Sequence, residues 1–244
     1  DTLIGGAGAD IIDGGAGLDT AAYTTSSAGV AINLAVGYAN GGDATGDTLV
    51  SIENLIGSNF SDILRGDDGS NVISGNQGGD ILDGQGGLDT VDYSTSSAGV
   101  AVNLKLNYAG GGDAAGDRIS NFERIRGSEH HDRLVGSDAG NRLFGGAGND
   151  FLDGGGAGDL LYGEGGNDIL VGGAGADLID GGNGEDTADY SNSSASIAIN
   201  LKVNYASGGN ATGDTLVSIE NLIGSNFNDT LRGDEGSNVL VGGL

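Results

Sequence analysis

The chain contains no cysteine, proline, methionine or tryptophan, and its only aromatic residues are seven tyrosines and five phenylalanines. The absence of cysteine excludes disulfide and thiolate chemistry. Since proline is missing and glycine does not recur at every third position, a collagen triple helix is excluded as well. With so few rings among 244 residues, a conventional core of large aromatic rings is excluded, and a thin, repetitive core remains possible.

Positive charge is also scarce, because nine Lys and Arg face 35 Asp and Glu, which gives a net charge of −26. A charge of this sign repels nucleic acid and anionic membranes, so we expect neither as a direct partner. No apolar run approaches the roughly 18 residues of a membrane-spanning helix, and we expect no membrane insertion. Disorder is the alternative for so acidic and glycine-rich a chain, and we expect it when no cation is bound.

A nine-residue repeat fills residues 127–189, where seven consecutive units each begin with glycine. The sixth position of the units is acidic or Asn, and the eighth is Leu, Ile or Ala. Glycines early in the unit permit a tight turn, and the strand that follows places the eighth side chain opposite the seventh and ninth. The aliphatic column therefore predicts a narrow core, and the units must stack to bury it.

A larger internal repeat runs through the chain, with copies at approximately 17–86, 87–183 and 184–244. The middle copy is longer by 27 residues, which corresponds to three extra nonapeptides. An insertion of whole units keeps the phase of strand and turn, as a stacked solenoid requires. We predict one continuous elongated solenoid over residues 1–244, although three modules fit the pattern too. Residues 1–4 fill the end of a unit, so we expect a fragment of a longer protein.

Each copy also has a segment that does not follow the nonapeptide pattern. Val100, Val102, Leu104 and Leu106 alternate with other residues, which predicts a longer, half-buried strand, with equivalents at 30–36 and 197–203. A glycine-rich turn follows, and then a second strand such as 49–56. No helical period is present, so the fold class is all-β.

Two units, GGAGNDFLD at 145–153 and GGAGADLID at 172–180, match the pattern G-G-x-G-x-D-x-U-x at every defined position. On these residues the chain resembles the RTX, or haemolysin-type, calcium-binding family. The resemblance implies a right-handed parallel β-roll, or β-solenoid, built from nonapeptides with longer inserted strands. It also implies several bound Ca²⁺ ions and a secreted, extracellular protein exported by type I secretion.

In the resembled family two nonapeptides make one turn, so calcium lies between loops 18 residues apart. The resemblance then implies metal ligands in the pairs Asp132/Asp150, Asp150/Asp168, Asp168/Asp186, Asn141/Asp159, Asp159/Asp177, Asp62/Asp80 and Asn71/Asp89, with an incomplete pair Asp1/Asp19. It implies carbonyl ligands from the loops of Gly146, Gly148, Gly173, Gly175, Gly182 and Gly184. One ion in each of these seven complete pairs would add about 14 positive charges. A lone aspartate in such a loop is ordinarily a turn former, and it is the repetition in phase that favours metal.

The glycine-rich turns of the longer segments carry further acidic residues, Asp43, Asp47, Asp113, Asp117 and Asp214. These residues predict either additional calcium sites or ordinary turn chemistry. Because Asn210 replaces the first acid in the third copy, the pattern leaves both open.

No catalytic motif is present: H-E-x-x-H, G-x-S-x-G and the P-loop are all missing, so we expect no enzyme. The duplicated modules resemble the rhizobial adhering proteins (Rap) with Ra, or cadherin-like, domains. That resemblance implies a calcium-dependent adhesin or lectin at the cell surface that binds acidic exopolysaccharide or capsular polysaccharide and contributes to biofilm. Tyr38, Tyr108 and Tyr205 recur beside the glycine-rich turns, where they either stack on a sugar or cap the core. The alternative function is a non-catalytic folding and export module of a larger secreted enzyme or adhesin.

Overall fold

The structure is a computed structural model that describes residues 1–243. They form two compact units, Asp1–Arg126 and Gly127–Leu244. The boundary between these units differs from the boundaries of the internal sequence copies, and a single continuous solenoid stays a prediction.

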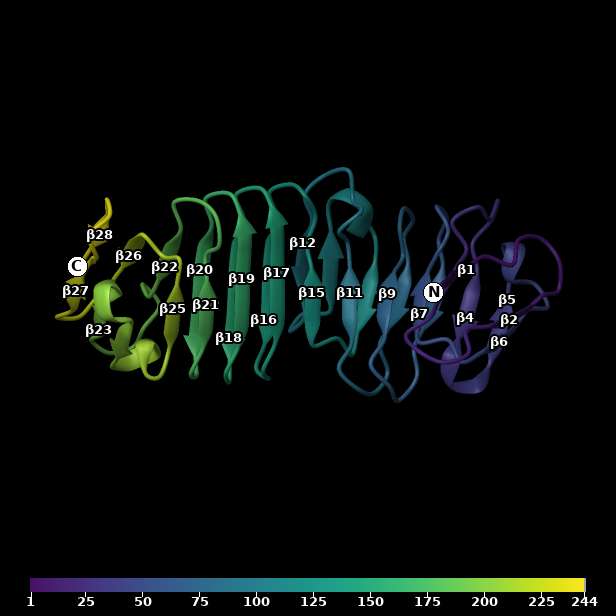
Figure 1. Cartoon of the computed structure of the whole chain (residues 1–244), viewed down its shortest axis with the longest axis horizontal. Helices are drawn as coiled ribbons and strands as arrows, with labels where there is room; N and C mark the ends of the chain where they lie inside the picture. Colours follow the sequence, from purple (N-terminus) through teal and green to yellow (C-terminus); the bar gives the residue numbers. More distant parts are fainter. Residues whose placement is uncertain (244) are drawn as a thin grey trace. The chain divides into compact units, whose positions relative to one another are not determined.

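Short β-strands make up almost all of the regular structure in both units (Figure 1). The strands of unit 1 are β1 (Thr2–Leu3), β2 (Ile11–Asp13), β3 (Thr20–Ala22), β4 (Ala31–Asn33), β5 (Tyr38–Asn40), β6 (Thr48–Val50), β7 (Asn54–Ile56), β8 (Ile63–Arg65), β9 (Val72–Ser74), β10 (Ile81–Asp83), β11 (Thr90–Asp92), β12 (Ala101–Asn103), β13 (Tyr108–Gly110), β14 (Arg118–Ser120) and β15 (Arg124–Arg126). Those of unit 2 are β16 (Arg133–Ser137), β17 (Arg142–Ala147), β18 (Phe151–Gly156), β19 (Leu160–Gly165), β20 (Ile169–Ala174), β21 (Leu178–Asp180), β22 (Thr187–Asp189), β23 (Ala198–Asn200), β24 (Tyr205–Ser207), β25 (Thr215–Val217), β26 (Asn221–Ile223), β27 (Thr230–Arg232) and β28 (Leu240–Val241).

The helical elements of the described residues are five single 3-10 turns: η1 (Leu34–Val36), η2 (Gly42–Ala44), η3 (Gly112–Ala114), η4 (Leu201–Val203) and η5 (Gly209–Ala211). Across residues 1–243, no helix has the length and apolar character needed to cross a membrane.

Strands β16 to β22 of unit 2 pair in parallel with the strand two nonapeptides away. Arg133 in β16 is paired with Phe151 in β18, and Phe151 with Ile169 in β20. The intervening nonapeptides pair separately, β17 with β19 and β19 with β21. Two nonapeptides therefore make one 18-residue coil, and successive strands alternate between two sheets. The expected parallel β-roll is confirmed.

Parallel strands also form two sheets within unit 1, where one sheet has the order β1-β3-β7-β9-β11-β15 and a second contains β14-β10-β8-β4. Where an inserted segment lies between two strands the paired residues are further apart in sequence, as Ile81 and Arg118 are. The eighth residue of each nonapeptide points between the sheets, and Leu64, Leu82, Leu134 and Leu152 are all 0% exposed. Burial of a leucine side chain contributes about 1.5–3 kcal/mol. Because each coil supplies only two such residues, the core is a thin double column of aliphatic side chains.

The longer strand predicted at Val100–Leu106 is wrong in its extent. β12 ends at Asn103, the chain turns, and β13 returns antiparallel to it. The Asn103 Oδ1 accepts the Leu106 N–H at 2.9 Å, and Asn107 has a φ of 51°, which together close a tight turn. Leu106 is 72% exposed as a result. The alternation in the sequence continues past the point where local turn chemistry ends the strand.

The strand predicted at 49–56 is also interrupted, since β6 and β7 are separate elements. Ser51, between them, has a φ of 51°, a conformation that ends an extended run. β6 pairs with β2, whereas β7 pairs with β3 and β9. The bend at Ser51 therefore moves the chain from one sheet to another.

Candidate metal centres

Aspartates at the sixth position of the nonapeptides form hydrogen-bonded ladders along the coils. The Asp132 N–H donates to Asp150 Oδ1 at 2.8 Å, and the Asp150 N–H donates in turn to Asp168 Oδ1 at 2.8 Å. The same contact joins every predicted pair, at 2.7–2.8 Å: Asp168/Asp186, Asn141/Asp159, Asp159/Asp177, Asp62/Asp80, Asn71/Asp89 and Asp1/Asp19. The structure thus brings together all the residues that the sequence placed 18 apart.

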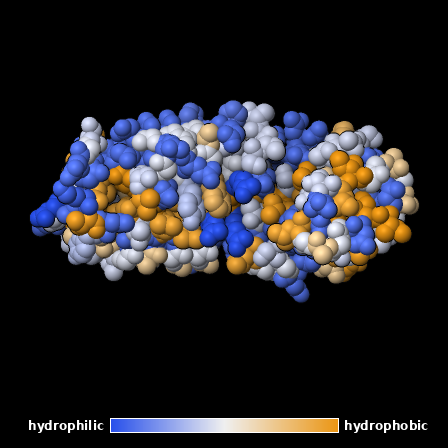
Figure 2. All heavy atoms as spheres, viewed as in Figure 1, coloured by the Kyte–Doolittle hydropathy of each residue, from blue (hydrophilic) through white to orange (hydrophobic). Residues whose placement is uncertain are grey.

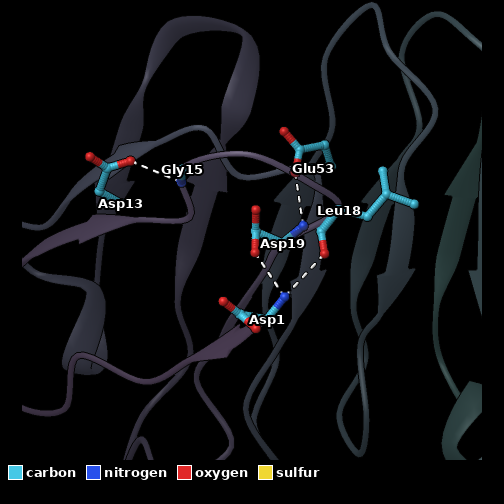
Figure 3. A network of polar contacts seen from close by, with 6 residues as sticks. All are labelled: Asp1, Asp13, Gly15, Leu18, Asp19 and Glu53. Atoms are coloured by element: carbon cyan, nitrogen blue, oxygen red, sulfur yellow. Dashed lines mark hydrogen bonds and ion pairs between the residues drawn. The ribbon is translucent and has the colours of Figure 1, made fainter.

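Figure 3 shows one rung of such a ladder in unit 1. The Asp1 amino group donates to Asp19 Oδ1 at 2.8 Å and to the Leu18 carbonyl at 3.2 Å. The Asp19 N–H donates to Glu53 Oε2 at 2.9 Å. The ladder therefore continues through a glutamate where the next coil lacks an aspartate.

The second carboxylate oxygen of nine loop aspartates has no hydrogen-bond partner although it is buried. These are the Oδ2 atoms of Asp10, Asp19, Asp80, Asp89, Asp150, Asp159, Asp168, Asp177 and Asp186. All but Asp10 belong to residues that are at most 3% exposed. Unpartnered buried carboxylate oxygens are costly and rare in folded proteins. Their repetition in phase fits a cation bound at these loops, and the assignment of ions to individual aspartates stays a prediction.

Burial shifts the acidity of the same carboxyl groups. Desolvation raises the pKa of Asp80, Asp150 and Asp159 to about 7, and the pKa of Asp89 and Asp186 to about 6. For Asp150, the carboxylates of Asp132 and Asp168 raise the pKa further. Removal from water and mutual repulsion both disfavour the charged form, and a bound cation would reverse that preference.

The six predicted carbonyl-donor glycines all have left-handed backbones. Gly146, Gly148, Gly173, Gly175, Gly182 and Gly184 have φ values from 90° to 151°. A Cβ added to Gly173 would lie 2.1 Å from the carbonyl oxygen of Gly155, one coil earlier. The corresponding distance from Gly184 to the carbonyl oxygen of Gly166 is 1.7 Å. Only glycine permits this approach, so the coils stack with backbone carbonyls against glycine Cα atoms.

Other loops have a serine or an aspartate at the second position, and the side chain of their sixth residue, Asp or Asn, accepts hydrogen bonds from within the loop. In the loop from Gly57 to Asp62, the Ser58 N–H donates to Asp62 Oδ2 at 2.6 Å and the Ser58 hydroxyl donates to Asp62 Oδ1 at 2.8 Å. Ser128 bonds both carboxylate oxygens of Asp132 in the same way, and the N–H and hydroxyl of Ser137 both donate to Asn141 Oδ1. Asn71 accepts from the Asp67 N–H at 2.8 Å. These four predicted ligands therefore already have partners inside their own loops, and their metal role stays a prediction.

The glycine-rich turns place Asp47, Asp117 and Asp214 in buried positions, each 6% exposed. Asp117 Oδ1 accepts the Asp80 N–H at 2.8 Å, so it occupies the ladder position of the next coil although it lies 37 residues further on. Asp47 and Asp214 make the equivalent contacts. Asp43 and Asp113 instead donate their backbone N–H groups to Ser26 and Ser96. A metal site in these turns stays a prediction.

Several ladder residues escaped the sequence prediction. Glu53, Glu123 and Glu220 accept the N–H groups of Asp19, Asp89 and Asp186 at 2.8–2.9 Å. Asp10 and Asp229 also lie in nonapeptide loops. The glutamates recur at one place in each sequence copy, and this recurrence could have identified them. Because each lies 34 residues from its partner, the period of 18 residues does not predict the contact.

Oxygen atoms dominate these loops, as a hard cation such as Ca²⁺ requires with its six to eight oxygen ligands. Among residues 1–243, no three His, Asp or Glu side chains converge on one point that would hold a metal. A division of the ligands between paired aspartates and backbone carbonyls of the glycine turns stays a prediction. Paired aspartates and inward-facing loops fit that division of ligands.

Stacked 18-residue coils with unpartnered aspartates and left-handed glycines define a calcium-binding parallel β-roll. The family model for the RTX calcium-binding nonapeptide repeat (4 copies) matches residues 1–21, 56–91, 126–161, 153–188 and 218–244. These segments cover more than half of the chain, and the chain belongs to this family. It binds multiple Ca²⁺ ions, and its repeat is a structural calcium-binding module of a kind typical of secreted proteins. A search of curated proteins returned no match.

Proposed function

We propose that this protein is a secreted, calcium-dependent adhesin or lectin that binds acidic extracellular polysaccharide at the cell surface. The observation that carries the proposal is a surface hairpin repeated in each sequence copy, with an exposed aromatic residue at the same position. Tyr38, Tyr108 and Tyr205 are 49%, 55% and 54% exposed. The resemblance of the duplicated modules to the rhizobial adhering proteins supports the same function.

The neighbouring residues of the hairpins are apolar and exposed too. Val36, Leu106 and Val203, two positions before the tyrosines, are 65–73% exposed. Figure 2 shows apolar residues at the surface over the part of unit 1 that carries β4 to β6. Recurrent exposed apolar and aromatic side chains indicate a binding surface, and a tyrosine ring combines an apolar face with a polar tip. An exposed aliphatic side chain next to a tyrosine suits a sugar ring, which has an apolar face and hydroxyl groups at its edge.

Shallow grooves on the sheets give a second location for a glycan. In unit 1 a groove of about 310 Å³ is lined by Thr20, Asn54, Ser74 and Asp92, among others. In unit 2 a groove of about 230 Å³ is lined by Thr187, Asn221 and Val241. Thr187 and Asn221 are the repeat equivalents of Thr20 and Asn54. Hydroxyl and amide groups around an apolar floor suit an oligosaccharide.

Calcium gives this acidic chain a route to an acidic ligand. With a net charge of −26, the metal-free protein repels a polyuronate. Calcium bound by the aspartate loops reduces that charge, and an exposed ion can bridge a protein carboxylate and a sugar carboxylate. We assign the metal to the loops whose aspartate Oδ2 atoms lack a partner, together with the carbonyl groups of their glycines.

The test is binding of a short oligouronate, too short to form a gel, with calcium and with chelator. We expect binding only with calcium, and loss of at least tenfold in affinity when Tyr38, Tyr108 and Tyr205 are all replaced by Ala. The matched variant with Phe at the three positions keeps the ring and should keep most of the affinity. Absence of binding under both conditions would favour the non-catalytic folding and export module instead.

A further inference from the structure

The nonapeptide loops fall into two classes according to the backbone of their second residue. Nine loops in residues 1–243 have a positive φ there, from 61° to 102°, at Gly6, Gly15, Asn76, Gln85, Gly146, Gly155, Glu164, Gly173 and Gly182. These are the nine loops whose aspartate Oδ2 has no partner. We name them open loops. Three of them hold a non-glycine residue in this unfavourable conformation, as happens where the surroundings or a ligand fix the backbone.

Six other loops have no positive φ at the second residue, which is Ser58, Asp67, Ser128, Ser137, Ser225 or Asp234. We name them closed loops. In each, the N–H of the second residue donates into the side chain of the sixth residue. A negative φ at the second residue thus accompanies this hydrogen bond, whereas in the open loops of Gly15 and Gln85 the same N–H donates to Asp13 and Asp83 Oδ1 at 3.1 Å.

Hydrogen bonds in a closed loop replace the contacts that a cation would make. In the loop of Ser225, the hydroxyl donates to Asp229 Oδ1 at 2.7 Å and accepts the Phe227 N–H at 3.1 Å. In the loop of Asp67 the donor and acceptor side chains exchange places, because the amide of the sixth residue, Asn71, donates to Oδ1 of the second residue, Asp67, at 3.3 Å. A serine at the second position is thus paired with Asp or Asn at the sixth position, and an aspartate at the second position is paired with Asn at the sixth.

The closed loops occur in adjacent pairs along the chain, at 57–74, 127–144 and 224–241. Each pair occupies 18 residues, the length of one coil, and each directly follows an inserted segment. Open loops follow the first two pairs, at 75–92 and 145–189. Each of these three nonapeptide blocks therefore begins with one coil made only of closed loops.

We propose that these opening coils bind no calcium through their own loops, and that the coils at 57–74 and 127–144 each form a calcium-independent start for the calcium-dependent ladder that follows. In these coils the second residue, serine or aspartate, is hydrogen-bonded to the sixth residue, and this bond keeps the loop closed. The sixth residue of the opening coil donates its backbone N–H to the side chain of the sixth residue in the next coil, as Asp132 donates to Asp150 Oδ1. The second residue of each loop is then the residue that determines whether the loop takes metal.

The test compares two isosteric substitutions in the full-length chain, Asp132→Asn in a closed loop and Asp150→Asn in an open loop. Asn141 already accepts both bonds from Ser137, at 2.6 and 3.0 Å, so an amide fits the closed loop. Bound calcium is counted by equilibrium dialysis, and folding is followed by far-ultraviolet dichroism against free calcium. We expect Asp132→Asn to leave the ion count and the calcium midpoint unchanged, and Asp150→Asn to lose one ion or raise the midpoint at least threefold.

A second variant keeps the result interpretable if Asp150→Asn does not fold. Ser128→Gly removes the hydroxyl and permits the left-handed backbone, so it should open the loop. We expect it to bind one more ion, or to need more calcium to fold, with the same dichroism at saturating calcium. The proposal is overturned if Asp132→Asn loses an ion, or if Ser128→Gly changes neither the ion count nor the midpoint.

Discussion

Three buried tyrosines hold the inserted segments to the ladders. Tyr23, Tyr93 and Tyr190 are each 1% exposed, and their hydroxyls donate to Asp47, Asp117 and Asp214 at 3.0, 2.9 and 2.8 Å. Desolvation and the adjacent carboxylate raise the pKa of the Tyr93 hydroxyl, which stays a donor. A hydrogen bond from a buried hydroxyl to a charged acceptor is among the stronger ones.

We therefore predict that Tyr93→Phe lowers the free energy of unfolding by about 1–3 kcal/mol, because Asp117 Oδ2 loses this donor while it stays buried. The measurement is urea denaturation at saturating calcium. Tyr108→Phe is the control, since the exposed Tyr108 ring should tolerate the change within about 0.5 kcal/mol. Equal effects of the two substitutions would show that the buried hydrogen bond contributes nothing.

At the scale of the element, the turn that follows each short strand depends on its left-handed residues. Gly173 has a φ of 99°, and its Cα approaches the carbonyl oxygen of Gly155. Glu164 occupies the equivalent position in the preceding loop with a φ of 70°. The left-handed conformation costs a non-glycine residue roughly 1–2 kcal/mol. Replacing the glycine at position 173 should therefore lower the stability, whereas introducing glycine at position 164 should raise it.

We predict that Gly173→Ala destabilises the calcium-bound protein by at least about 2 kcal/mol, since strain and a steric clash add. Glu164→Gly should raise the free energy of unfolding by up to about 1 kcal/mol by relieving strain. Thermal unfolding at fixed free calcium measures both. A neutral Gly173→Ala would mean that adjacent coils can separate at this point without cost.

Much of this arrangement could be predicted from the sequence, because a fixed period of nine makes the eighth and sixth columns visible. The burial of Leu152 and the contact between Asp150 and Asp168 both follow from that period. The inserted segments were harder to predict. Their alternation indicated long strands, whereas single side chains such as that of Asn103 decide where the chain turns.

Whether a loop is open or closed could not be predicted from the sequence, for a different reason. Asp132 and Asp150 occupy the same position of the repeat, yet one is bonded by Ser128 and the other has a free Oδ2. The difference arises from the backbone of the second residue, and Glu164 and Gln85 adopt the glycine-like conformation without being glycine. Residue type alone does not reveal this choice.

For the whole molecule, folding and calcium binding should be one transition. Without ions the stacked loops place carboxylates in register, and the thin core opposes repulsion and chain entropy with little buried area. Binding free energy then becomes folding free energy. We predict an expanded metal-free chain that becomes compact and β-rich cooperatively with calcium, measured by hydrodynamic radius and dichroism. Magnesium, which demands tight octahedral geometry and retains its waters, should substitute poorly. A compact metal-free state unchanged by millimolar calcium would contradict this.

The pH dependence of the metal-free chain should be opposite to the usual acid denaturation. Burial raises the pKa of Asp80, Asp150 and Asp159 from 3.8 to about 7, so the folded state binds more protons than the unfolded state between these values. Its stability therefore increases as pH falls from about 7 to about 4, by about 1.4 kcal/mol per pH unit for each such group. Dichroism of the chelated protein at pH 5 and pH 8 measures this, and greater structure at pH 8 would contradict it.

Protons and Ca²⁺ compete for the carboxylates of the folded state, so the calcium affinity of the folded state should fall as the pH drops below about 7. The calcium midpoint of folding is measured against the unfolded chain, whose aspartates have a pKa of 3.8, so this midpoint should not rise until the pH approaches about 4. A midpoint that rises between pH 7 and pH 5 would contradict the raised pKa values of the buried aspartates.

The narrow aliphatic column also determines how the protein responds to temperature. Heat capacity increases on unfolding mainly through the exposure of apolar surface, typically by about 12–15 cal/mol/K per residue. Each coil buries only two aliphatic side chains at its centre, such as Leu143 and Leu152, so the increment per residue should lie below that range. A small increment flattens the curve of stability against temperature. The free energy of unfolding of the calcium-loaded roll would then change little with temperature. It would depend mainly on the calcium concentration around the protein.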